Sequence, residues 1–154
     1  MGPIRRTRAG DFRLDLSDGE RQLLRSLPGE LALLLENDPE DSSLRRLFPP
    51  AYEDDAEGEA EYASLMHGEL LAGRRHALSV LEATVDRDRL SEDELEAWLG
   101  ALNDLRLVLG TRLGVTEDLY EQDLDPRHPH AHEHAVYAYL TWLQGHVVEA
   151  AEEA

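Results

Sequence analysis

Cysteine is absent from this chain of 154 residues, and lysine is absent as well. Without thiols the chain can form no disulfide, no thiolate nucleophile and no cysteine-ligated zinc site. No apolar run approaches the roughly 18 residues that a membrane helix needs, and no apolar segment follows the basic N-terminus. We therefore expect no membrane span and no secretion signal, and we expect a cytoplasmic protein.

Positive charge is also scarce. The 15 arginines face 33 acidic residues, which gives a formal net charge of −18. A negative field of this size repels phosphate backbones, so direct nucleic-acid binding is not expected. The exception is the N-terminal segment, where Arg5, Arg6 and Arg8 form a basic edge. An acidic surface with such an edge favours a protein that docks on a basic protein partner, and a homodimer is compatible with it.

The length and the hydrophobic patterning predict a mainly α fold. A chain of this size can bury about 70% of the surface that its unfolded form exposes, which suits one domain and not two. We expect a single-domain helical bundle over residues 1–154, with a short N-terminal β-hairpin over residues 3–16. The main helices are predicted at residues 17–36, 54–85, 91–113 and 131–151.

Local signals support the first elements. Apolar residues alternate with polar ones from Phe12 to Leu16, as in a half-buried strand. Ser17 and Glu20 then form a capping box, in which each side chain satisfies a backbone N–H of the other residue. Pro28 lies in the middle of the helix that follows and is expected to kink or divide it.

Similar signals define the later elements. Residues 86–89 read as an exposed turn, and Ser91 with Glu94 repeats the capping box. The helix that begins there is dense in leucine and should be packed by neighbours on several sides, so we expect it to be central. Gly114 is expected to end it in a left-handed conformation.

Three polar residues lie inside this apolar helix: Asn103, Asp104 and Arg106. An unpaired buried charge would cost several kcal/mol, so these side chains need partners. One interpretation, which we favour, is an internal polar network that ties the central helix to the hairpin or to the acidic loop. The alternative is a groove for a partner protein, in which Gly110 lets another backbone approach closely.

Histidines alternate through the segment that contains His128, His130, His132 and His134. Imidazole is a common ligand of zinc, copper and nickel. If a helix begins near His130, then His130 and His134 lie one turn apart and could bind a metal, with Glu133 or Asp125 as a third ligand. The spacing alone is a weak signal, because the same histidines also suit a solvated helix entry.

Catalytic motifs are absent from the sequence. It contains no glycine-rich phosphate loop, no serine–histidine–aspartate motif and no H-E-x-x-H. We therefore expect a non-enzymatic protein without a cofactor. The alternative is a metal-binding protein or metal-dependent enzyme that uses the His128–His134 cluster.

Three runs carry a family resemblance: LFPPAY at 47–52, WLGALNDLRLVLGTRLGVTED at 98–118 and YLTWLQ at 139–144. Together they resemble the AosR-like family of actinobacteria, long described only as a domain of unknown function. The likeness extends from about Phe12 to the C-terminus. It implies a regulator of the oxidative-stress response that acts at the level of transcription, through contact with RNA polymerase or a sigma factor.

One feature of the family does not carry over. The resemblance implies a thiol switch, which cannot operate in a chain without cysteine. Either this chain is active as a regulator at all times, or the oxidative signal reaches it through a partner protein. The resemblance supplies no catalytic residues.

Overall fold

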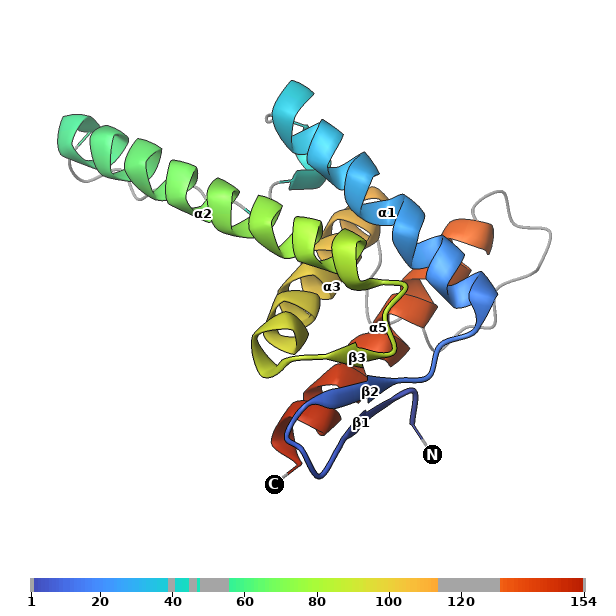
Figure 1. The fold of residues 1–154 in the computed structure, drawn as a ribbon. Helices are drawn as coiled ribbons and strands as arrows, with labels where there is room; N and C mark the ends of the chain where they lie inside the picture. Colours follow the sequence, from blue (N-terminus) through green and yellow to red (C-terminus); the bar gives the residue numbers. More distant parts are fainter. Residues whose placement is uncertain (1, 39–40, 45–46, 48–55, 114–130, 154) are drawn as a thin grey trace.

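The computed structural model describes residues 2–38, 41–44, 47, 56–113 and 131–153, and only the backbone of residues 42 and 56–67. Within these ranges the fold is mainly α, as predicted, with long helices packed beside a small antiparallel sheet (Figure 1). The helices are α1 (Asp18–Asn37), α2 (Ala56–Thr84), α3 (Glu92–Leu113) and α5 (Ala131–Glu152), and a 3₁₀ turn, η1, covers Ser42–Leu44.

The predicted hairpin is confirmed, and a third strand extends it. Strand β1 (Ile4–Arg6) pairs with β2 (Phe12–Leu14), and β2 pairs on its other side with β3 (Arg89–Leu90), all antiparallel. Gly10 closes the hairpin with a φ of +93°, a conformation that glycine adopts at little cost. The exposed turn expected at 86–89 therefore ends in a strand.

Both predicted capping boxes are confirmed. At α1 the Ser17 hydroxyl accepts a bond from the Glu20 N–H at 3.2 Å, and the Glu20 carboxylate accepts one from the Ser17 N–H at 3.1 Å. At α3, Ser91 and Glu94 make the same reciprocal pair. Of the two outcomes expected at Pro28, a kink or a division of the helix, the division is wrong, since α1 continues through it and the proline ring is buried.

The central position of α3 is confirmed, because it contacts α1, α2, α5, η1 and β3. Trp98 is fully buried in the core, and its indole N–H donates to the Thr84 hydroxyl at 2.7 Å. Phe12 and Leu14 bring the inner face of the sheet into the same cluster of apolar side chains. Gly114 lies outside the described residues. None of the described helices is long and apolar enough to cross a membrane.

Candidate functional site

Asp104 lies on the side of α3 that faces α2, and its side chain is only 3% exposed. Arg74 of α2 donates to the Asp104 carboxylate and, at 2.9 Å, to the carbonyl oxygen of Leu47. Burial raises the pKa of Asp104 above its usual value, and the hydrogen bond and charge of Arg74 partly oppose this. Arg74 thus joins α3 and α2 to Leu47, three residues after the end of η1.

Asn103 points to a different neighbour. Its side-chain oxygen accepts a hydrogen bond from Gln144 of α5 at 3.3 Å. Arg106 is half-buried, and its Nε atom has no hydrogen-bond partner within the described part of the chain. The structure therefore does not bring the three polar residues of α3 to one point: Asp104 bonds to α2 and Asn103 to α5.

Gly110 lies in the C-terminal part of α3. The group that packs closely against it is the side-chain ring of Tyr137, and not the backbone of another segment, as the sequence had suggested. A Cβ atom at this position would lie 2.7 Å from Cε2 of Tyr137 on α5. Real Cβ atoms do not come that close to a ring carbon, so any larger residue requires the ring to shift. Gly110 is thus part of the packing between α3 and α5.

An open groove of about 340 Å³ runs between α2 and α3 beside the Arg74–Asp104 pair. Its lining includes the small residues Gly73, Ala77 and Gly100. Leu70, at its edge, is 38% exposed. This groove contains Asn103 but neither Arg106 nor Gly110, so it is not the partner groove along Asn103, Arg106 and Gly110 that the sequence offered as the alternative.

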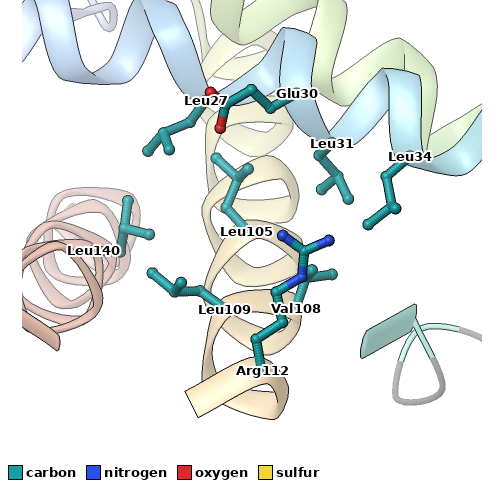
Figure 2. A pocket seen from close by; sticks show the side chains of 9 residues that line it. All are labelled: Leu27, Glu30, Leu31, Leu34, Leu105, Val108, Leu109, Arg112 and Leu140. Carbon is teal, nitrogen blue, oxygen red and sulfur yellow. The ribbon is translucent and has the colours of Figure 1, made fainter. Parts of the chain in front are cut away.

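A second groove, of about 90 Å³, was not anticipated from the sequence (Figure 2). It lies where α1, α3 and α5 meet, and Glu30 and Arg112 are its charged members. Its apolar lining consists of Leu27, Leu31, Leu34, Leu105, Val108, Leu109 and Leu140. The broad leucine face of α1 is the only signal in the sequence that could have indicated it.

The basic edge is divided between two faces of the sheet. Arg5 is exposed on β1, and Arg8 is exposed in the hairpin turn. Arg6 lies with its guanidinium 4.8 Å from the centre of the Phe12 ring, on the side of the strand that faces the core. Arg6 therefore contributes to packing, while Arg5 and Arg8 remain accessible to solvent.

The predicted metal site falls largely outside the described residues, because Asp125, His128 and His130 are not among them. His134 and Glu133 lie in the first turn of α5. Within the described ranges, no three histidine, aspartate or glutamate side chains are grouped so that they could hold a metal ion. The metal hypothesis stays a prediction about the segment before α5.

Comparisons with known proteins place this fold in a family. A family model described as a domain of unknown function (DUF2017) matches residues 1–151. The oxidative stress regulator AosR of Mycobacterium bovis is 32% identical over 176 aligned positions, which cover 89% of this chain and 80% of that protein. The protein of the same name from Mycobacterium tuberculosis matches with the same identity and coverage.

No solved structure matches the chain. The resemblance noted in the sequence is confirmed by both kinds of match, since the family model spans nearly all of the chain and the relatives align over most of it. The chain belongs to the AosR-like family, described as a domain of unknown function (DUF2017).

Proposed function

We propose that this chain is a non-enzymatic regulator of the oxidative-stress response that acts in transcription by binding a protein. The observation that carries the proposal is the name of the mycobacterial relatives, oxidative stress regulator AosR, together with an alignment over 89% of this chain. RNA polymerase or a sigma factor is the proposed partner. The acidic charge of −18 supports contact with a basic protein surface over contact with DNA.

The polar residues of α3 serve the fold in this proposal. Asp104 is almost fully buried against Arg74, and Asn103 is bonded to Gln144, so both side chains already have partners within the chain. Such groups stabilise the packing of helices when they are satisfied. The regulatory contact is then made by surface residues, and the oxidative signal does not pass through a thiol of this chain.

The direct test is an affinity pull-down at low salt from the cytoplasm of the organism that encodes the chain. We expect RNA polymerase or a sigma factor to be retained by the intact protein. Loss of this retention with a variant of unchanged melting temperature would identify a contact residue. If no transcription protein is retained, the proposed function is wrong.

Two substitutions distinguish a role in stabilising the fold from a role in binding the partner protein. Asn103→Ala and Arg106→Ala, made separately, should lower the melting temperature whether or not a partner is present, since the first removes the hydrogen bond to Gln144 and the second removes a half-buried side chain. Capture of the partner by the folded variants should persist. Loss of capture with an unchanged melting temperature would instead assign the residue to a partner-binding groove.

A further inference from the structure

The register of the sheet places three arginines side by side. Arg5 of β1 is opposite Arg13 of β2, and Arg13 is opposite Arg89 of β3. Successive residues of a strand point to opposite faces, and the neighbouring Phe12 and Leu14 face the core. The three arginines therefore share the outer face of the sheet, where each is exposed to solvent. We call Arg5, Arg13 and Arg89 the arginine row.

This arrangement is unfavourable for the sheet itself. Neighbouring strands are about 4.8 Å apart, and like charges directly opposite each other destabilise strand pairing. Charged residues on edge strands discourage aggregation, but Arg13 lies on the central strand β2, so edge protection does not account for it. The arginine row lowers the stability of strand pairing and does not serve to protect an edge strand. Binding of an anionic ligand explains its presence better.

The row is only partly neutralised by the protein. Arg89 lies 3.4 Å from Asp11, whose pKa is held below its usual value by the Thr7 hydroxyl and by Arg89. Among the described residues, no carboxylate lies within ion-pair distance of Arg5 or Arg13. Two guanidinium groups in the row are thus available to an external anion.

We propose that the arginine row binds an acidic segment of the partner protein, with its carboxylates paired to Arg5 and Arg13. The guanidinium group matches a carboxylate in a two-point hydrogen bond, which favours this ligand. The inference rests on the proposed function, because it names the surface and the chemistry of the partner contact. The net charge of −18 favours contact with a basic surface of the partner, and the arginine row adds a second contact, with an acidic segment of the same partner.

The size of the row favours a short acidic segment over a nucleic acid. Arg13 and Arg89 line one surface hollow together with four carboxylates, so the positive surface is short and ends where these acidic side chains begin. The carboxylates are those of Asp15, Asp18, Asp86 and Asp88. A long polyanion would extend past the row and meet the remaining negative surface of a chain with net charge −18. Nucleic acid is therefore disfavoured at the same site.

The test measures binding of a fluorescent hexaglutamate peptide to the full chain by anisotropy at low salt. The variant Arg5→Gln/Arg13→Gln/Arg89→Gln should bind the peptide about tenfold more weakly or worse, because it removes charges in direct contact. The control Arg75→Gln/Arg106→Gln/Arg112→Gln removes the same charge from α2 and α3 and should change the affinity by less than about twofold. The melting temperature of the row variant should change little, since the like-charge repulsion that is removed offsets the loss of the exposed Arg89–Asp11 pair.

Three results would overturn the inference. The first is that the wild-type chain does not bind hexaglutamate. The second is that the control variant loses as much affinity for the peptide as the row variant does. The third is that a single-stranded oligothymidylate binds through the same arginines more tightly than hexaglutamate does. The pull-down separates this inference from the proposed function. If the row variant still captures a transcription protein, only the inference about the arginine row is wrong. If the wild-type chain binds hexaglutamate but captures no transcription protein, only the proposed function is wrong.

Discussion

The hydroxyl group of Tyr139 donates a 2.8 Å hydrogen bond to Oε2 of Glu20, which joins α5 to the first turn of α1. The other oxygen of the same carboxylate, Oε1, accepts the Ser17 N–H of the capping box. One glutamate thus caps a helix and fixes the position of that helix against another, 119 residues away in sequence. Its charge should therefore matter to stability.

The stability contributed by Glu20 should be lost at acidic pH. Burial raises the pKa of Glu20, but the hydrogen bonds from Tyr139 and Ser17 outweigh it and hold the pKa below its usual value. A carboxyl group with a lowered folded pKa stabilises the fold above its unfolded pKa, about 4.3, and the contribution disappears as pH falls through the folded pKa. Urea unfolding between neutral pH and about pH 3 measures this loss.

The variant Tyr139→Phe tests the same bond. At neutral pH it should lower the free energy of unfolding by about 1.5–3 kcal/mol, because a hydrogen bond to a charged group is removed. The difference from the wild-type protein should shrink below the folded pKa of Glu20. A difference that stays constant across this range would show that Tyr139 acts through packing and not through the carboxylate.

Loss of Arg74 should be costly, because it leaves Asp104 buried without its cation. For Arg74→Gln we expect a loss of about 3 kcal/mol at neutral pH. The loss should be smaller near pH 4, since the burial that raises the pKa of Asp104 favours the protonated form once Arg74 is gone. The measurement is urea unfolding at both pH values.

Arg75→Gln is the matched control for that substitution. Arg75 neighbours Arg74 on the same helix and pairs with Glu36 of α1, but both side chains are at least 40% exposed. Exposed ion pairs contribute at most about 1 kcal/mol, so this variant should be nearly as stable as the wild-type protein. Equal losses in the two variants would contradict a special role for the buried pair.

Gly110→Ala should destabilise the protein by about 1 kcal/mol, because the new methyl group forces the Tyr137 ring to move. Gly145→Ala on α5 is the control, since a Cβ atom there meets nothing within 4 Å. In an open helical position alanine is preferred over glycine by about 0.5–1 kcal/mol, so the control should gain stability. Thermal unfolding of both variants checks the opposite signs.

Protein purified without a histidine tag should contain less than about 0.1 equivalent of zinc, copper or nickel. The reason is that the His128–His134 segment is punctuated by Pro126 and Pro129, and alternate histidines are a weak ligand pattern. Elemental analysis provides the measurement. Stoichiometric metal that is lost in His130→Ala and His134→Ala would favour the metal-binding alternative.

Much of the fold was predictable because its signals are local. The starts of α1 and α3 depend on the pairs Ser17 with Glu20 and Ser91 with Glu94, each only three residues apart. The hairpin likewise depends on alternation and on a glycine in its turn. Strand β3 was missed because its two residues form a strand only by pairing with β2, far away in sequence.

Pro28 shows the opposite case, in which a strong local signal did not prevail. A proline in a helix interior removes one hydrogen bond and disfavours the turn before it. In α1 the proline is buried, and the apolar face of the helix packs against the rest of the core on both sides of it. Tertiary packing, and not local propensity, supplies most of the stability of such a helix.

The sequence by itself determined the exclusion of thiol chemistry, the acidic charge, the mainly α class and the family resemblance, since composition, periodicity and sequence runs are properties of the chain alone. Only the tertiary structure decided which polar residues of α3 meet which helices, and that Arg5, Arg13 and Arg89 lie in one row. The reason is physical. Partners across a sheet or a helix interface are set by register and packing between segments distant in sequence.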